Sequence, residues 1–380
     1  MKKLISALAA FATVCVAAAS LVANAAPIDP SGNDGVTASD SLYIQKFLAG
    51  MFPSYNLNSM DVDTNGIVSE MDSDKILHYL TNRDNPLLPD APANYDTTTL
   101  KNIEERKYRK HKYSSSSSTS YSTYTVKRPP SSNMLSSDYD CMPMGIIGDN
   151  NMVRDTDSAV VRLRDPGGVG TGFIVGKHVI ATAAHCVYNK TNGAYIDNNI
   201  EVVDENNNII DSFHAESVHV PTNYKNYSNN NDHVYYDYAL LYVPSVDLSE
   251  YGMFSLGVAK DEFITDTSNK VSVSGFPVGY PSGYENTPYG LRFKASGNIY
   301  NAGNTQYCLS YTADTTGGVS GGPVYVEEGF FGGDNLWHNY KTVIGINAYG
   351  ASSDKEPICN FGVKITPELL TFYNHNQYLN

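Results

Sequence analysis

Short apolar runs separated by turns dominate the chain from residue 146 onward. Two such runs, at 173–176 and 179–182, are interrupted by Lys-His and predict a strand, a turn and a second strand. A further apolar run at 238–243 has the length and composition of a buried strand. Gly, Asn, Asp and Pro residues mark the turns between the runs. The pattern predicts a mainly β domain of two antiparallel barrels over residues 144–380.

The pattern differs in the N-terminal part of the chain. Apolar side chains recur at helical spacing in residues 41–49 and 73–80, which predicts two short amphipathic helices, each preceded by an acidic loop. Residues 86–143 have little apolar periodicity and contain a serine run followed by Lys-Arg-Pro-Pro. Such a composition cannot bury a core, so this segment is predicted to be a flexible linker or a propeptide. A small helical module at 27–85 therefore precedes the β domain.

Residues 1–25 have the features of a signal peptide. Lys2 and Lys3 precede a short alanine-rich apolar stretch, and Ala-Asn-Ala closes it as a cleavage motif. Secretion to the extracellular space is therefore predicted. Cleavage removes two lysines and no acids, which takes the net charge of the 380-residue chain from −14 to −16. An acidic protein of this kind lacks the basic surface that nucleic-acid binding needs.

Four cysteines remain after removal of the signal peptide, which carries Cys15. They are Cys141, Cys186, Cys308 and Cys359. An even number in an exported chain allows disulfides in three alternative pairings, and the sequence does not choose among them.

Three polar residues in distinct local contexts predict a nucleophilic site. His185 follows the second predicted strand, Asp237 directly precedes the apolar run at 238–243, and Ser320 lies in Gly-Gly-Val-Ser-Gly-Gly-Pro. A serine hydroxyl is a poor nucleophile at neutral pH, so it needs an imidazole base and a carboxylate that holds the imidazole in the right tautomer. Ser320 is the predicted nucleophile, His185 the general base and then acid, and Asp237 the residue that orients His185.

The glycines beside Ser320 allow a sharp turn that exposes backbone amides. The N–H groups of Gly318 and Ser320 are the predicted oxyanion donors. The same segment also fits Gly-x-Ser-x-Gly, the nucleophile turn of α/β-hydrolases, but that fold needs its acid and histidine after the serine. Only His338 and His375 follow Ser320, and neither has a suitable context, so the order His, Asp, Ser favours a protease.

Taken together, residues 146–371 resemble a chymotrypsin-like serine protease of the bacterial glutamyl endopeptidase branch. The resemblance is carried by Ile-Gly-Asp-Asn-Asn from 147, Gly-Thr-Gly-Phe from 170, Val-Ser-Gly-Phe-Pro from 273, Asp-Thr-Thr-Gly-Gly-Val-Ser-Gly-Gly-Pro from 314 and Val-Ile-Gly-Ile-Asn from 343. It implies a trypsin-like fold of two six-stranded barrels with the site in the cleft between them. In the wider family the cysteine after the histidine bonds to one on the preceding strand. Residues 170–173 contain none, so Cys186 pairs elsewhere or stays reduced.

The resemblance also implies a substrate pocket formed by Asp314, Thr315, Asn347 and Gly350. In the glutamyl branch a threonine five residues before the serine and a histidine bind the substrate carboxylate. Thr315 matches the threonine, whereas Asn347 replaces the histidine. A carboxylate at the position of Asp314 selects Arg or Lys in trypsin-like enzymes. An acidic or polar preference is therefore expected slightly ahead of a basic one.

Residues 61–72 have the spacing of a calcium loop. Oxygen ligands fall at positions one, three, five and twelve, namely Asp61, Asp63, Asn65 and Asp72, with glycine at position six. A poorer copy at 29–40 offers Asp29, Asn33 and Asp40 and is expected to bind more weakly. Two such loops with aspartate at position twelve resemble a dockerin, which implies Ca²⁺ binding and attachment to a cohesin domain on a scaffold protein or cell surface.

Two functions of different class follow from these features. The first is a secreted serine endopeptidase that acts on proteins or peptides, needs no cofactor for catalysis and is tethered through its dockerin-like module. The second is a catalytically decayed protease fold that serves as a calcium-dependent docking module. A decayed site need not keep His185, Asp237 and Ser320 together, so the enzyme is favoured.

Overall fold

The structure is a computed structural model. It describes residues 30, 36–51, 55–81, 144–148, 151–226, 232–278, 290–301, 306–331, 337–353 and 356–377. The predicted signal peptide, the predicted linker at 86–143, Asp29, Asn33 and Cys141 lie outside the described residues.

The first half of the β domain is an antiparallel sheet of seven strands. In spatial order the strands are β10 (Ser217–His219), β11 (Ala239–Tyr242), β5 (Val179–Thr182), β4 (Gly168–Gly176), β3 (Val160–Asp165), β8 (Asn199–Val203) and β9 (Ile209–Phe213). The predicted strand, turn and strand are confirmed as β4 and β5. Every residue of β5 is buried: the first three are apolar, and the Thr182 hydroxyl donates a hydrogen bond of 2.7 Å to the Thr171 carbonyl.

The second half is a sheet of eight strands. In spatial order these are β16 (Cys308–Tyr311), β19 (Glu356–Lys364), β18 (Trp337–Ser353), β17 (Pro323–Phe331), β14 (Lys270–Gly275), β15 (Phe293–Asn298) and β2 (Val153–Arg154), with β12 (Ser255–Leu256) beside β18. The prediction of a mainly β domain is confirmed. Six strands closed into each barrel stays a prediction, since the described strands form sheets of seven and eight.

Short elements lie between the strands of both sheets and after the last strand. They are η2 (Ala184–Cys186), β6 (Tyr188–Asn189), β7 (Ala194–Tyr195), α6 (Thr222–Asn226), η3 (Asp232–Tyr236), η4 (Leu248–Tyr251), β13 (Val258–Ala259), α7 (Asp261–Thr265) and the C-terminal α8 (Pro367–Gln377).

The two predicted N-terminal helices are confirmed as α2 (Ala38–Leu48) and α4 (Glu70–Thr81), joined by α3 (Leu57–Met60) and β1 (Ile67–Val68). Both begin three residues earlier than predicted because polar side chains cap their N-termini. Thr37 and Asp40 form a capping box at the start of α2. At the start of α4 the Ser69 hydroxyl accepts a hydrogen bond from the Met71 N–H.

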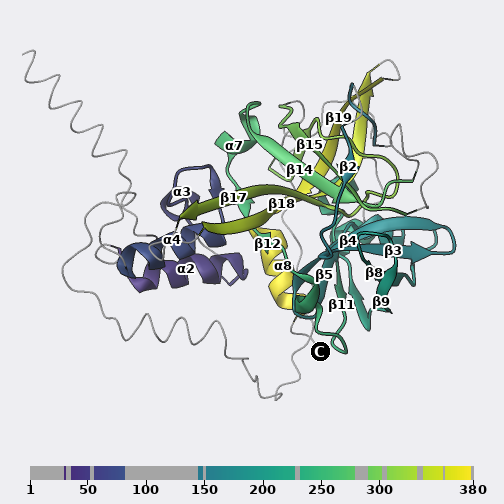
Figure 1. Ribbon diagram of the computed structural model, residues 1–380, viewed down its shortest axis with the longest axis horizontal. Helices are drawn as coiled ribbons and strands as arrows, with labels where there is room; N and C mark the ends of the chain where they lie inside the picture. The colour runs from purple at the N-terminus through teal and green to yellow at the C-terminus, as the bar shows by residue number, and fades with distance from the viewer. Residues whose placement is uncertain are drawn as a thin grey trace, which may run out of the picture.

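The helical module packs directly on the β domain. Figure 1 shows α2 and α4 beside α8 and the outer ends of β17 and β18. Ile44, Phe47 and Ile76 of the helices are at most 2% exposed and belong to the same hydrophobic core as Tyr238 and Leu370 of the β domain. The module and the β domain therefore share apolar burial, which is the main stabilising contribution to folding.

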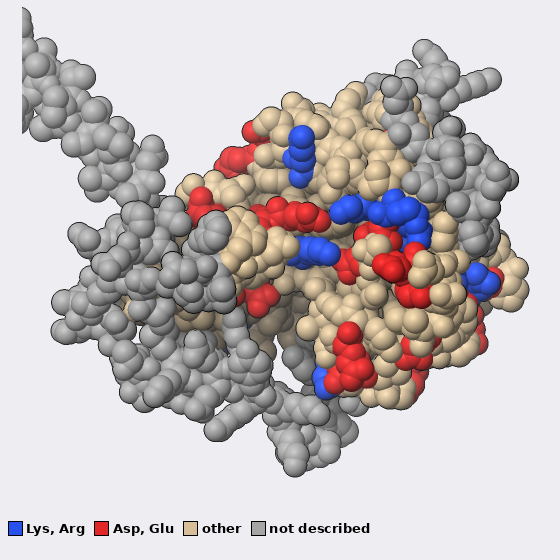
Figure 2. Space-filling model, viewed as in Figure 1, with Lys and Arg blue, Asp and Glu red and all other residues tan. Residues whose placement is uncertain are grey.

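The described surface carries mixed charge. On the face seen in Figure 2, acidic and basic side chains lie next to one another and no broad basic field is visible among the described residues. Ion pairs such as Lys294 with Glu327 and Lys341 with Asp157 contribute to this pattern. No described helix is both long and apolar enough to cross a bilayer.

Candidate active site

His185 and Asp237 meet as predicted. The short helix η2 presents His185 directly after β5, and Asp237 lies just before β11, the neighbour of β5 in the first sheet. Asp237 Oδ2 lies 2.7 Å from His185 Nδ1, and Asp237 Oδ1 accepts a hydrogen bond of 2.9 Å from the His185 backbone N–H. The carboxylate is completely buried, whereas the imidazole is 32% exposed. Asp237 thus fixes the ring through Nδ1, an arrangement in which Nε2 can act as a base.

The electrostatics of the pair favour the charged forms of both residues. Burial alone would raise the pKa of Asp237, but the adjacent His185 and hydrogen bonds from His185 and Tyr349 hold it below its usual value. Burial would lower the pKa of His185, but Asp237 and the neighbouring Cys186 outweigh burial and hold it well above its ordinary value. Asp237 therefore stabilises the imidazolium that forms when His185 takes a proton.

Tyr349 is a member of the site that sequence reasoning missed. Its hydroxyl donates a hydrogen bond to Asp237 Oδ2, the same oxygen that faces His185 Nδ1. Its ring centroid lies 5.7 Å from that of His185. No motif in the sequence marks this tyrosine, which is one of 29. Tyr349 is a positioning residue because it acts on the imidazole through Asp237.

Replacing Tyr349 by Phe is expected to lower kcat about 3–10-fold. A hydrogen bond to a charged group contributes roughly 1.5–3 kcal/mol, and only part of the energy lost at Asp237 affects the orientation of the His185 imidazole. The Asp237 carboxylate, having lost a donor, should hold the imidazolium more strongly. The acid limb of the kcat/KM profile should then move to higher pH. Tyr195→Phe, at a half-exposed position on β7, is the matched control. An unchanged kcat and pH profile in Tyr349→Phe would exclude the positioning role.

Ser320 lies on a tight turn pressed against the segment that carries His185. Gly321 has φ +83°, and a Cβ there would lie 2.2 Å from Thr182 Oγ1 and 3.0 Å from the Ala183 backbone N. The Ser320 carbonyl accepts hydrogen bonds from the Thr171 N–H at 2.8 Å and the Cys186 thiol at 3.4 Å. Only glycine at 321 allows this approach, which brings the serine loop of the second sheet beside η2.

The turn also leaves two backbone N–H groups available. Gly318 has φ +89°, and the Thr171 hydroxyl holds its carbonyl at 2.7 Å. The N–H groups of Val319, Gly321 and Gly322 are used in backbone hydrogen bonds. Those of Gly318 and Ser320 make none to any described residue. Two unused donors on one turn are what an oxyanion site requires.

Asn347 lies beneath the serine turn and is fully buried. Its Nδ2 donates to the Val319 carbonyl at 3.1 Å and contacts Met144 Sδ at 2.8 Å, while its Oδ1 accepts from the Tyr311 hydroxyl at 2.6 Å. Its backbone also bonds to Gly321 and Gly322. Asn347 therefore braces the turn that carries Ser320, and a direct role in substrate binding stays a prediction.

The remaining predicted pocket residues differ in whether their polar atoms already have hydrogen-bond partners. Asp314 accepts hydrogen bonds of 2.7 Å from the N–H groups of Ile147 and Asn151, one on each carboxylate oxygen. Thr315 is fully buried, and its Oγ1 has no hydrogen-bond partner among the described residues. Gly350 is buried on β18, directly after Tyr349, and pairs with Asn360. A buried hydroxyl without a hydrogen-bond partner is costly. A polar group bound in this pocket would therefore gain a hydrogen bond from the Thr315 hydroxyl.

The cysteine beside the histidine carries a thiol. Gly170 of β4 faces Cys186: a Cβ at Gly170 would lie 3.1 Å from Cys186 Sγ. The resemblance would put a partner cysteine on this strand, but the strand has glycine there and Cys186 is not in a disulfide. Cys359 is also unbridged, and burial raises its pKa to about 12. Of the two alternatives for Cys186, pairing elsewhere or staying reduced, the structure has the reduced thiol.

The second acidic loop forms a separate cluster beside β1. Oxygens of Asp61, Asp63 and Asp72 all lie within 4.8 Å of one another. Calcium takes oxygen ligands at about 2.3–2.6 Å, so ligands across one ion are separated by up to about 5 Å. Asp61 Oδ1 is buried and has no hydrogen-bond partner among the described residues. The fourth predicted ligand, Asn65, hydrogen-bonds to Asp63. These residues fit a hard cation.

Of the first acidic loop only Asp40 is described among its predicted ligands. It is fully buried, and its Oδ2 accepts from the backbone N–H and the hydroxyl of Thr37 as part of the capping box. A cation site in this loop stays a prediction.

Comparison with known proteins identifies the family of the β domain. A family model described as Trypsin matches residues 146–368. The chain is 25% identical over 188 residues to a glutamyl endopeptidase of Bacillus licheniformis, a match that covers 47% of this chain and 54% of that protein. It is 26% identical over 208 residues to a protein of Bacillus subtilis named extracellular metalloprotease, covering 55% and 57% respectively.

The matches to curated relatives are partial. The chain spans little more than half the length of the two curated relatives described above. Among solved structures, that of a Glu endopeptidase in complex with MPD has a TM-score of 0.48 at 19% identity and covers 61% of this chain and 99% of that one.

Proposed function

The chain belongs to the trypsin family of serine proteases, and we propose that it is a secreted endopeptidase that cleaves peptide bonds through Ser320, His185 and Asp237. The observation that carries the proposal is the buried Asp237 carboxylate holding His185 through both the ring and the backbone. Secretion rests on the signal-peptide pattern of residues 1–25.

The residues support an acyl-enzyme mechanism. His185 Nε2 takes the proton of the Ser320 hydroxyl as the serine oxygen bonds to the substrate carbonyl carbon. The N–H groups of Gly318 and Ser320 stabilise the oxyanion, and His185 then protonates the leaving amine as the peptide bond breaks. A water molecule, deprotonated by His185, attacks the acyl-enzyme and releases the second product and Ser320.

The proposal is tested by incubating the purified chain with a chromogenic ester substrate at high enzyme concentration. An initial burst of product equivalent to the enzyme concentration, followed by slower turnover, is expected for an acyl-enzyme. Absence of both burst and turnover on esters, peptides and denatured protein would leave the decayed docking protein as the function.

We infer an acidic preference at the residue before the scissile bond. The Thr315 hydroxyl is a buried donor that lacks a partner among the described residues, whereas both oxygens of Asp314 are engaged by backbone N–H groups. A peptide library varied at this position is expected to favour Glu, Asp or Gln. Thr315→Val should lower kcat/KM for the Glu peptide by about 10-fold, since it removes one hydrogen bond to a charged group.

The matched control for this variant is Thr316→Val, the same substitution at the next position, which is less buried than Thr315. It should leave the preference for Glu unchanged. Preference for Arg or Lys, abolished by Asp314→Ser, would show that Asp314 selects the substrate instead. Preference for Phe or Leu would contradict both versions of the pocket.

A second proposed function belongs to the N-terminal module, which we propose binds Ca²⁺ through Asp61, Asp63, Asn65 and Asp72. The observation that favours it is the buried Asp61 Oδ1, which has no hydrogen-bond partner in the described structure. Attachment to a cohesin domain rests on the resemblance to dockerins. Retention of the chain on an immobilised cohesin in calcium and its release by a chelator would test attachment.

A further inference from the structure

The contact between residues 36–81 and the β domain, here called the seam, is centred on the acidic loop. Strand β1 pairs antiparallel with β13, aligning Ile67 with Ala259 and Val68 with Val258. The Lys260 N–H extends the pair by donating to the Gly66 carbonyl at 2.7 Å. Loop residues 61–72 thus form a separate two-stranded sheet with β13 of the β domain while holding the predicted cation ligands.

Two side chains of the β domain contact the ligand cluster itself. Lys260 Nζ lies 3.2 Å from Asp61 Oδ2, and the Lys260 side chain is 16% exposed. Glu328 Oε1, on β17, accepts a hydrogen bond of 2.7 Å from Asn65 Nδ2. The charge of the loop is therefore compensated partly from across the seam.

The cluster has more negative than positive charge. Asp61, Asp63, Asp72 and Glu328 face only two ammonium groups in the described structure, Lys260 on Asp61 and Lys75 on Asp63, at 3.2 and 2.5 Å. With all four carboxyl groups ionised, two negative charges are left over in a mostly buried position, where charge without a counter-ion is costly. A single divalent cation matches that excess and also satisfies Asp61 Oδ1, which has no partner among the described residues although its side chain is only 1% exposed.

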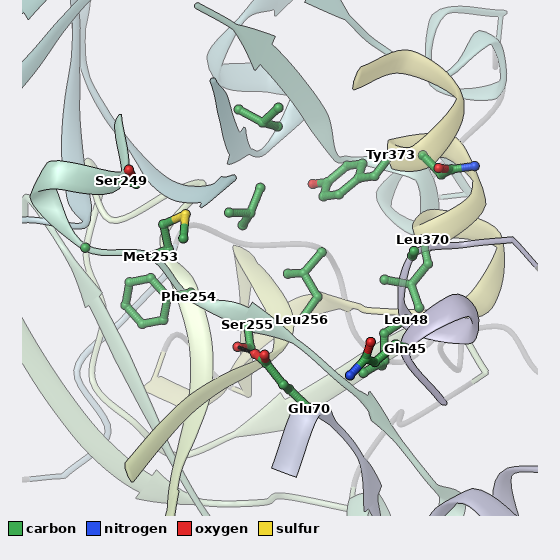
Figure 3. A pocket seen from close by; sticks show the side chains of 15 residues that line it. Gln45, Leu48, Glu70, Ser249, Met253, Phe254, Ser255, Leu256, Leu370 and Tyr373 are labelled. Atoms are coloured by element: carbon green, nitrogen blue, oxygen red, sulfur yellow. Dashed lines mark hydrogen bonds between the residues drawn. The ribbon is translucent and has the colours of Figure 1, made fainter. Parts of the chain in front are cut away.

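Elsewhere the seam is incompletely packed. Figure 3 shows side chains of α2, α4 and α8 facing the segment 249–256 across a cavity. The volume of this cavity is about 700 Å³. At the cavity the Ser255 hydroxyl donates to Glu70 at 2.7 Å, and elsewhere along the seam the Tyr340 hydroxyl donates to Asp74 at 2.8 Å. A cavity forfeits dispersion contacts along its lining, so the loop and its strand pair add to the apolar contacts of Ile44, Phe47 and Ile76 in holding the module on the β domain.

We propose that a divalent cation in loop 61–72, calcium by the oxygen chemistry of its ligands, clasps the N-terminal helices onto the protease domain of the same chain, with Lys260 and Glu328 as the contacts on the protease side. The inference rests on the proposed calcium site. The module then stabilises the protease domain of its own chain when calcium is bound, and it can also bind an outside partner.

The clasp is tested on the full chain carrying Ser320→Ala to prevent self-digestion. Calcium at about one hundred times its Kd is expected to raise Tm by roughly 5–10 °C. It should slow amide hydrogen exchange of residues 258–260, which lie in the protease domain, by up to about 100-fold. Asp63→Ala should lose both effects. Asp197→Asn, whose side chain is 87% exposed on the first half of the β domain, is the control and should keep both.

Lys260→Met separates the clasp from the metal site. This variant should still bind calcium in a calorimetric titration, but calcium should protect residues 258–260 far less than in the parent. Calcium binding without any change in Tm or in exchange at 258–260 would overturn the clasp and leave the calcium site standing. No calcium binding at millimolar concentration would overturn both, while the protease proposal is judged separately by turnover of the chain with Ser320 intact.

Discussion

Ser320→Ala is expected to lower kcat by about 10⁴-fold or more, because the alanine leaves no atom that can form the acyl-enzyme. His185→Ala should cost a similar factor, since the serine hydroxyl then keeps its proton. The double variant should lose little beyond either single one, because the residues act as a unit. Residual hydrolysis above the uncatalysed rate is expected, because the backbone N–H groups at positions 318 and 320 remain in every variant.

The measurement is kcat on a peptide ester for the purified variants, with folding checked by circular dichroism. Ser296→Ala, at an exposed position of β15, is the matched control and should keep normal turnover. Near-normal turnover by Ser320→Ala would end the assignment of the nucleophile.

Asp237→Asn is expected to lower kcat about 10⁴-fold while leaving the fold intact. Asp237 accepts hydrogen bonds from His185 Nδ1, the His185 backbone N–H and the Tyr349 hydroxyl. An asparagine amide that donates to Nδ1 would place the imidazole proton on Nε2, where a base is needed. The loss should therefore appear in kcat far more than in KM.

The same variant should shift the pH dependence in a defined direction. Asp237 holds the pKa of His185 above its ordinary value, and only neutral imidazole can accept the serine proton. In the parent chain, the acid limb of the kcat/KM profile should therefore have its midpoint above about pH 6.5. Below that midpoint kcat/KM should fall about tenfold per pH unit. Asp237→Asn removes the carboxylate charge, so the limb should move to lower pH. A limb that stays in place would show that another group controls it.

The sequence was sufficient for the parts of the site that depend on local chemistry. His185, Asp237 and Ser320 each lie in a motif whose neighbours explain the backbone, and the glycines at 318 and 321 have the positive φ that such a turn needs. The helices were predicted from apolar periodicity, although their first turns depend on caps at Thr37 and Ser69 that the periodicity does not reveal.

Contacts between distant residues could not be predicted in the same way. Tyr349 follows an irregularity in the pairing of β18 with β19, between Asn347 and Tyr349, and period-two alternation does not say where its side chain goes. Likewise, Asp61 and Lys260 are 199 positions apart. Loop spacing identifies cation ligands but carries no information on which surface the loop packs against.

A fluorophosphonate probe that reacts only with activated serines tests the role of Ser320 most directly. The purified chain should be modified once, and peptide mapping should place the added mass on Ser320. His185→Ala should reduce the labelling rate by several orders of magnitude, because the hydroxyl is then no longer activated. Modification of a different serine, or no modification of a folded chain, would contradict a Ser320–His185–Asp237 protease.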